Sequence, residues 1–297
     1  MPKASHTLLP ECSVVAVSGR DARSFLQGQL TNDLLGLERH PGLLAAACNR
    51  EGRVLEVLRL ASHGDTVLIV VRLALAGALI ARLGKHVLRA QVSIEDRSHA
   101  LAVAGLMDAS PGGSWSMAQP AAAGLTVMVA GPRRILLVAP PASLDQVLHD
   151  SDRALSGDWD RACIEDGEPT VYPETAGKWI PQMLNLDLLS AVSFTKGCYV
   201  GQEIVARTQH LGRIKRRMLR FTGPAGASFS PGQPLYSGDS QAAEVVASCN
   251  GPRGMELLAV TELRFCSELL GASRGGSEWV PADLPYSIPA PATATAP

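Results

Sequence analysis

The sequence lacks the features that identify several large classes of protein. Its 27 basic and 28 acidic residues leave a formal charge of −1, so no general attraction to nucleic acid or to an anionic membrane is expected. No stretch approaches the roughly 20 uninterrupted apolar residues of a membrane-spanning helix. The N-terminus also lacks the apolar core of a signal peptide. We therefore expect a soluble, cytoplasmic protein with no direct nucleic-acid or membrane partner.

The cysteines and histidines are too scattered for a disulfide framework or a metal centre. No two of the six cysteines form a CxxC pair, and the seven histidines are spread along the chain. A chain of this size without an export signal needs no disulfides, and its thiols should be reduced. The spacing of zinc and iron–sulfur ligands is missing, so no resident metal is expected. Glycine-rich nucleotide motifs and GxSxG are absent in any usable context.

What is present is a mixture of short strands and helices. Apolar runs predict strands, and helical spacing predicts amphipathic helices. A hairpin is predicted where two apolar runs flank Asn49 to Gly52, with Gly52 at the turn. The predicted strands are 12–18, 43–49, 53–60, 65–71, 91–96, 101–106, 125–130 and 134–139, and the predicted helices are 21–30, 72–84 and 142–150. This mixture indicates an α+β fold.

Composition divides the chain into three parts. Residues 1–218 hold the mixed elements, with a Gly-, Pro- and Ser-rich loop at 110–114. Residues 219–280 change to short strands and turns, which predicts a small β-barrel domain. Residues 281–297 are a Pro- and Ala-rich tail, whose last ten residues are predicted to be disordered.

The segment with the most chemical information is KGCYVGQEIVAR, residues 196–207. A helix-compatible run follows Cys198, which places the thiol just before a helix N-terminus. The helix dipole and Lys196 would both favour the thiolate, the reactive form of cysteine, although Glu203 would oppose this if directed at the sulfur. Arg207 lies four residues after Glu203, in register for an ion pair. The alternative is that Cys198 is a small buried apolar residue, as most free cysteines are.

This segment resembles the signature of the YgfZ family, K-G-C-Y-x-G-Q-E. Flanking blocks agree with the family in order and spacing, and the resemblance covers nearly all of residues 8–287. The blocks are VSGRDARSFLQGQLTNDL at 17–34, AACNREGRVLEVLRL at 46–60, the stretch 159–194, and LPYSI at 284–288.

The resemblance implies a fold and a function. YgfZ proteins share the fold of the glycine-cleavage T-protein, in which domains surround a central folate pocket, so residues 1–218 are expected to form two interleaved α+β subdomains. The implied cofactor is tetrahydrofolate, possibly polyglutamylated. The implied role is assembly or repair of iron–sulfur clusters, including those of tRNA-modifying enzymes, with client or assembly proteins as partners.

The resemblance also implies site residues. The functional thiol and its motif neighbours are Cys198, Lys196, Gln202 and Glu203. The expected folate contacts are Trp159, Glu165, Tyr199 and Arg207. An indole can stack on a pterin ring and a carboxylate can accept its hydrogens. The alternatives are that Trp159 is a core anchor and that Glu165 belongs to a solvated helix face.

Two departures from the family pattern affect the expected chemistry. Cys12 stands where the family has an aromatic residue, so part of the folate contact differs. Residues 72–85 contain no Asp or Glu, although the T-protein's catalytic aspartate belongs near the start of this helix. An aminomethyl transfer would lack its acid–base group, so T-protein activity is not expected.

A basic stretch follows the motif, and two interpretations of it stay open. It is either a solvated strand face or a docking surface for the glutamate tail of folate or an acidic partner. Its members are Arg207, His210, Arg213, Lys215, Arg216, Arg217 and Arg220. For the whole chain, the leading hypothesis is a folate-dependent accessory factor whose thiolate acts as a transient metal or sulfur ligand, or as a nucleophile. The alternatives are a folate-dependent one-carbon transferase and an adaptor that binds clients through its barrel.

Overall fold

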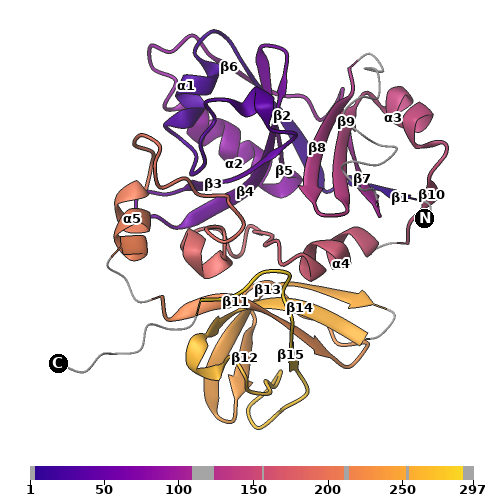
Figure 1. Ribbon diagram of the computed structural model, residues 1–297, viewed down its shortest axis with the longest axis vertical. Coiled ribbons are helices and arrows are strands. Elements are labelled where there is room, and N and C mark those ends of the chain that lie inside the picture. Colours follow the sequence, from indigo (N-terminus) through magenta and orange to yellow (C-terminus); the bar gives the residue numbers. More distant parts are fainter. Residues whose placement is uncertain (1–3, 109–123, 156, 211–213, 252–253, 290–297) are drawn as a thin grey trace.

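Three β-sheets and a few short helices form an α+β fold, as predicted (Figure 1). The computed structural model describes residues 4–289 apart from 109–123, 156, 211–213 and 252–253. The loop predicted at 110–114 therefore lies outside the described residues. Within the described part of the chain, no helix is long and apolar enough to cross a membrane.

The first sheet carries the predicted hairpin and is antiparallel. Its strand order is β3-β4-β5-β2-β6. The strands are β2 Cys12–Ser18, β3 Leu43–Cys48, β4 Val54–His63, β5 Thr66–Arg72 and β6 Ser93–Asp96, and the accompanying helices are α1 Ala22–Gln27, η1 Leu37–Arg39 and α2 Leu73–Gly84. α1 is shorter than the predicted 21–30 because Leu30 already forms a backbone bridge with Ala47 of β3.

The second sheet combines a strand from the start of the chain with strands from residues 102–153. Its order is β10-β1-β7-β9-β8, so the chain starts in this sheet, completes the first one and then returns. Its elements are β1 Ser5–Leu8, β7 Ala102–Met107, β8 Thr126–Gly131, β9 Arg134–Ala139, β10 Asp152–Arg153 and the helix α3 Pro141–Leu148. β8 lies against β4, which joins the two sheets side by side (Figure 1).

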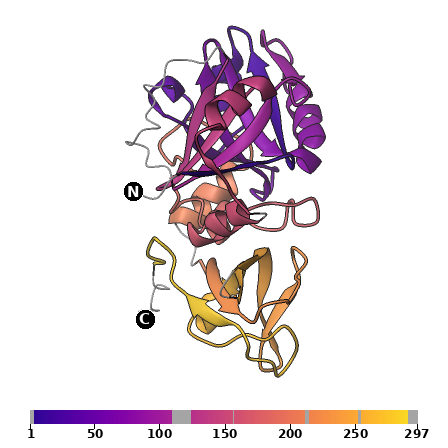
Figure 2. The ribbon, with the colours of Figure 1, turned by 90° about the vertical axis from the view of Figure 1, so that its right-hand side faces the viewer.

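The third sheet forms the lower body, seen apart from the first two in Figure 2. Its order is β12-β13-β14-β11-β15. The elements are β11 Arg216–Gly223, β12 Pro234–Ser237, β13 Ser240–Gly251, β14 Gly254–Glu262, η3 Leu263–Phe265 and β15 Val280–Ala282. Bridges from Gly271 to β12 and from Leu270 to Trp279, beside β15, link the two edge strands. The sheet thereby closes into a small barrel.

The boundaries predicted for the C-terminal part differ from those of the barrel. β11 begins at Arg216, and β15 pairs with it, so the boundary placed at residue 281 falls inside a strand. The chain then returns to the larger body, where the Tyr286 hydroxyl donates to the Gly167 carbonyl at 2.8 Å. Residues 290–297, which hold most of the segment predicted to be disordered, lie outside the described residues.

A connecting layer of short helices lies between the barrel and the two upper sheets (Figures 1 and 2). It contains α4 Asp158–Glu165, η2 Pro181–Leu184 and α5 Gln202–His210. A buried ion pair fastens the barrel to this layer, because Arg217 of β11 donates twice to Asp187, at 2.7 and 2.9 Å. Breaking such a buried pair costs about 3–5 kcal/mol.

Glu56 of β4 makes stability depend on pH. Its carboxylate is buried against Arg82 of α2, and burial raises its pKa from 4.5 to about 7. The folded state therefore binds more protons than the unfolded state between these values, and the free energy of unfolding should fall by about 2–3 kcal/mol as pH rises from 4.5 to 7. Urea unfolding of Glu56→Gln should lack this decrease. Parallel pH curves for the two proteins would contradict the prediction.

Candidate functional site

Cys198 is exposed, in contrast to the alternative that it is a buried apolar residue. Cys266 is the other exposed cysteine of the described residues, whereas Cys48 is buried and the remaining three are partly buried. Burial raises the pKa of Cys12, Cys48 and Cys163 to about 12, so these groups stay protonated thiols at neutral pH. Accessibility therefore leaves Cys198 and Cys266 among the described cysteines, and of these two Cys198 belongs to the signature segment.

Lys196 anchors the Cys198 loop to the end of α1. Its ammonium donates three hydrogen bonds of 2.6–2.8 Å to backbone carbonyls. The accepting residues are Gln27, Leu30 and Asn32. These contacts favour the charged amine, whereas burial lowers its pKa to about 8. The charge of Lys196 thus positions the loop, and a direct effect on the Cys198 thiol stays a prediction.

Two glycines bring the hairpin turn and the signature loop into backbone contact. Gly201 has φ +83° and Gly52 has φ +69°, the left-handed region that favours glycine. A Cβ on Gly201 would collide with the Asn49 carbonyl oxygen, and a Cβ on Gly52 would lie 2.9 Å from the Ile204 Cβ. The Asn49–Gly52 turn therefore packs against the start of α5.

The glycines of the signature should respond differently to alanine. Gly201→Ala should lower the free energy of unfolding by about 2–4 kcal/mol, because it adds backbone strain to a collision. Gly197 is the matched control: its φ lies outside the left-handed region, and a Cβ there would meet open space. Gly197→Ala should change stability by less than about 0.5 kcal/mol in urea unfolding. Equal losses in the two variants would contradict this account.

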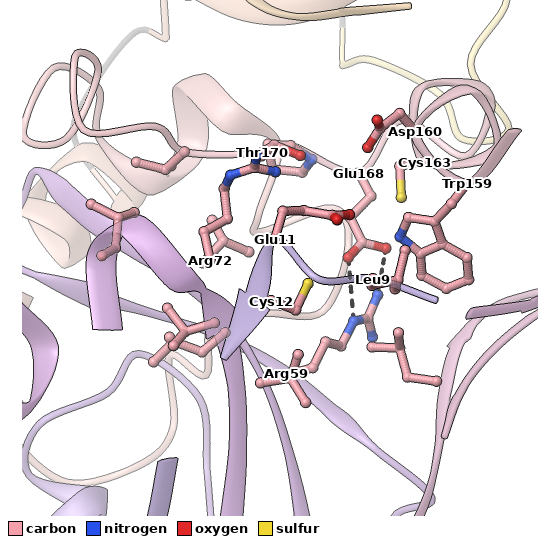
Figure 3. Close-up of a pocket in the computed structure, with 18 residues that line it drawn as sticks. Leu9, Glu11, Cys12, Arg59, Arg72, Trp159, Asp160, Cys163, Glu168 and Thr170 are labelled. Atoms are coloured by element: carbon pink, nitrogen blue, oxygen red, sulfur yellow. Dashed lines mark hydrogen bonds and ion pairs between the residues drawn. The ribbon is translucent and has the colours of Figure 1, made fainter. Parts of the chain in front are cut away.

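Trp159 lines a second location, a cavity of about 90 Å³ that we call the Trp159 cavity (Figure 3). The indole comes from α4, is 9% exposed, and packs where a Cβ on Gly105 would collide with it. Its other neighbours in this cavity include Cys12, Arg72 and Glu168. The wall therefore combines an aromatic ring, a carboxylate and a guanidinium.

A buried ion network lies beside Trp159. Glu168 accepts from Arg59 at 2.6 Å and from Arg134 at 2.7 Å, and Arg134 also donates to Asp166 at 2.6 Å. The Arg134 guanidinium lies 5.1 Å from the centroid of the Trp159 ring. Arg59 belongs to the first sheet and Arg134 to the second, so this network fastens the two sheets to the segment after α4.

Two further cavities adjoin the network. The central cavity, of about 680 Å³, is lined from the first sheet, β8 and the network, and includes His40, Arg59 and Glu168. The α4 cavity, of about 230 Å³, is strongly polar and includes Arg161 and Glu165. Arg161 is 3.8 Å from Glu165, and that acid lines neither of the other two cavities.

The structure separates the predicted site residues into two groups. Trp159 and Glu165 lie on α4, whereas the signature residues lie at α5, at the other side of the connecting layer (Figure 1). Cys198 is not among the residues that line the three cavities. Thiol and indole are therefore not neighbours in one pocket.

The remaining signature residues divide by burial. Tyr199 is buried beside Lys196, whose Nζ lies 5.2 Å from the ring centroid, and burial raises the tyrosine pKa. Gln202 opens α5, and Glu203 on its exposed face forms the predicted ion pair with Arg207 at 2.6 Å. Neither Tyr199 nor Arg207 lines the three cavities, so their predicted folate contacts gain no support from this arrangement.

The basic stretch is largely occupied by ion pairs. Arg217 is buried against Asp187, so neither interpretation of the stretch, a solvated strand face or a docking surface, holds for this residue. Arg216 pairs with Glu262 at 2.7 Å and Arg220 with Glu256 at 2.5 Å. Arg213 lies outside the described residues. Across the part of the chain that the structure describes, no three His, Cys, Asp or Glu side chains gather as a metal site.

Sequence reasoning missed the arginines of the network. Arg59 interrupts an apolar strand, and Arg134 opens one whose six residues are all buried. A charge inside such a strand needs a buried partner, so an arginine within an apolar strand was the sequence pattern that could have indicated the network. No sequence pattern indicated that Glu168 has a role in the site, since it is one of three acids in the segment IEDGEP.

Comparison with known proteins places the chain in a fold class and then in a family. No protein-family model matches it. Aminomethyltransferase T of the glycine cleavage system from Bartonella henselae superposes on 94% of this chain and 85% of its own, with a TM-score of 0.71 at 16% identity. The fold is therefore that of the T-protein.

Sequence relatives narrow the assignment. The tRNA-modifying protein YgfZ of Serratia proteamaculans is 30% identical over 233 residues, which cover 73% of this chain and 71% of the relative. The tRNA-modifying protein YgfZ of Vibrio atlanticus is 32% identical over 232 residues, which cover 75% and 71%. The chain belongs to the YgfZ family, as its signature segment predicted.

Proposed function

We propose that this protein is a cytoplasmic, tetrahydrofolate-binding accessory factor that supports the assembly or repair of iron–sulfur clusters, including those that tRNA-modifying enzymes need. The observation that carries the proposal is the exposed Cys198 thiol on a loop fixed by Lys196 and Gly201. A fixed, accessible thiol can ligate a soft metal or sulfur species briefly and release it.

The folate part of the proposal rests on the cavities at the centre of a T-protein fold. A pterin is flat and amide-like, with ring nitrogens and an amino group that need polar partners. Trp159, Arg59 and Glu168 offer an apolar ring, donors and an acceptor around one space. These residues fit such a ring, and folate bound there would supply one-carbon carrier chemistry.

A one-carbon transferase receives less support. α2 carries no acid, and Arg72 at its N-terminus lines the Trp159 cavity where a T-protein-type reaction would need a carboxylate. The Arg72 guanidinium lies 4.4 Å from the centroid of the Tyr172 ring. A cation cannot take a proton from an amine donor, so α2 supplies no acid–base group here, and the nearby carboxylates of this cavity, Glu11 and Asp160, come from other segments.

Calorimetric titration with tetrahydrofolate tests the folate part. The wild type should bind, and Trp159→Ala should lose about tenfold in affinity, because an aromatic contact contributes about 1 kcal/mol beyond its buried area. Trp179→Phe is the control, since Trp179 is buried outside the three cavities and pairs with Glu244. Circular dichroism checks that each variant folds. Absence of binding by the wild type would refute the folate part.

A further inference from the structure

The junction between two cavities carries an inference that reaches beyond the exposed thiol. The Trp159 cavity and the central cavity share the lining residues Arg59 and Glu168, so the two spaces meet at this ion pair. Figure 3 shows the Glu168 carboxylate directed at Arg59, with Trp159 beside it. A ligand in either cavity can therefore contact Glu168.

The Glu168 carboxylate is held in place by both sheets. Arg59 reaches it with Nη2 at 2.6 Å and Nε at 3.3 Å, and Arg134 reaches it with Nη2 at 2.7 Å. Arg59 Nη2 also donates to the Ala130 carbonyl at 2.7 Å. Burial alone would raise the pKa of Glu168, but the two arginines outweigh it and hold the pKa below its usual value. The group is a charged, preorganised acceptor.

This carboxylate still has room for a ligand. A carboxylate has about four lone-pair positions. The three contacts from the described arginines place two donors on Oε2 and one long contact on Oε1. Oε1 can therefore accept a further N–H from a molecule in the cavity.

Among the described residues, no other acid that lines these two cavities has the same position. Glu11 and Asp160 line only the Trp159 cavity, and Asp33 and Asp166 line only the central one. Glu165, the acid that the family resemblance selected, lines the α4 cavity. Glu168 is thus the one acid that a ligand spanning both spaces would meet from either side.

We propose that Glu168, in place of Glu165, is the acid that recognises the pterin ring, and that it determines specificity for a ring with an amino group. This rests on the proposed function, in which the ligand is tetrahydrofolate. The pterin presents its amino group beside a ring N–H, and a single carboxylate can accept from both donors. Arg59 and Arg134 act as positioning residues, because they fix the carboxylate.

The test compares two ligands on the full-length protein by calorimetry. The ligands are tetrahydrofolate and the analogue that lacks the pterin amino group. Wild type and Glu165→Gln should both prefer tetrahydrofolate by about tenfold or more. Glu168→Gln should weaken tetrahydrofolate binding by about tenfold or more and should bind the two ligands with affinities within about threefold of each other.

The possible failures are distinguishable. A wild type that binds no tetrahydrofolate refutes the proposed function itself. A wild type that binds both ligands equally, a preference that survives in Glu168→Gln, or a preference lost in Glu165→Gln overturns the assignment to Glu168. If Glu168→Gln does not fold, the ligand preference is measured instead in Glu11→Gln, Asp160→Asn and Glu165→Gln. Each must then keep the preference, and its loss in any one of them refutes the assignment.

Discussion

Replacement of Cys198 by serine is expected to abolish the support of iron–sulfur enzymes in cells while the protein stays folded and binds tetrahydrofolate with unchanged affinity. The side chain is exposed and lines none of the three cavities, so neither the core nor the folate contacts depend on its sulfur. A serine hydroxyl stays protonated at neutral pH and is a poor ligand for soft metals or sulfur species. The measurement is the activity of cluster-dependent enzymes in a strain that lacks the chromosomal gene.

Cys266→Ser is the matched control for this experiment. Cys266 is also exposed, but it follows η3 in the barrel, away from the signature segment. The control should restore cluster-enzyme activity to the wild-type level, whereas Cys198→Ser should leave it at the level of the deletion strain. Full restoration by Cys198→Ser would remove the thiol from the mechanism and favour the adaptor hypothesis.

The second large effect is expected from Lys196→Met, which should lower the free energy of unfolding by about 3 kcal/mol. Methionine has similar length but no donor, so three carbonyls that now accept from a buried ammonium would lose that partner. Because Lys196 fixes the loop two residues before Cys198, the loop should also become looser. In a Cys266→Ser background, the rate constant for alkylation of Cys198 should therefore differ between the Lys196→Met variant and the protein that keeps Lys196.

Lys178→Met is the control, because it shows how much stability is lost when a lysine without the three carbonyl contacts is replaced by methionine. Lys178 is more exposed, and its Nζ lies 3.3 Å from Glu244 in a partly exposed ion pair, for which a loss of about 1 kcal/mol is expected. Urea unfolding should show a small loss for Lys178→Met and a large one for Lys196→Met. Similar losses in both would mean that the three carbonyl contacts do not anchor the loop.

The sequence predicted the local elements well because their signals are short-range. β2 and β5 are continuous apolar runs between turn residues, and α2 keeps one apolar face at helical spacing, so local apolar patterns mark them. The ion pair between Glu203 and Arg207 also follows from helical spacing. The failure at α1 has a tertiary cause, since Leu30 in its last predicted turn pairs with Ala47 of β3.

The site depended on contacts between residues that are distant in the sequence. Arg59 and Glu168 are 109 residues apart, and Lys196 reaches carbonyls more than 160 residues away. Periodicity carries no information on such pairs, because each partner satisfies its own local pattern. The burial of Arg217 also depends on a partner elsewhere in the sequence, Asp187, although a run of basic residues is typical of a protein surface.

The sequence by itself determined the α+β class, the signature segment and the family, because these follow from local burial patterns and from matched residue types. Only the tertiary structure decided that Lys196 holds a loop, that Cys198 faces solvent, and that Glu168 lies where two cavities meet. A buried charged group needs a partner of opposite charge or a hydrogen-bonding group. The packing of the three sheets determines which groups lie close enough to be that partner.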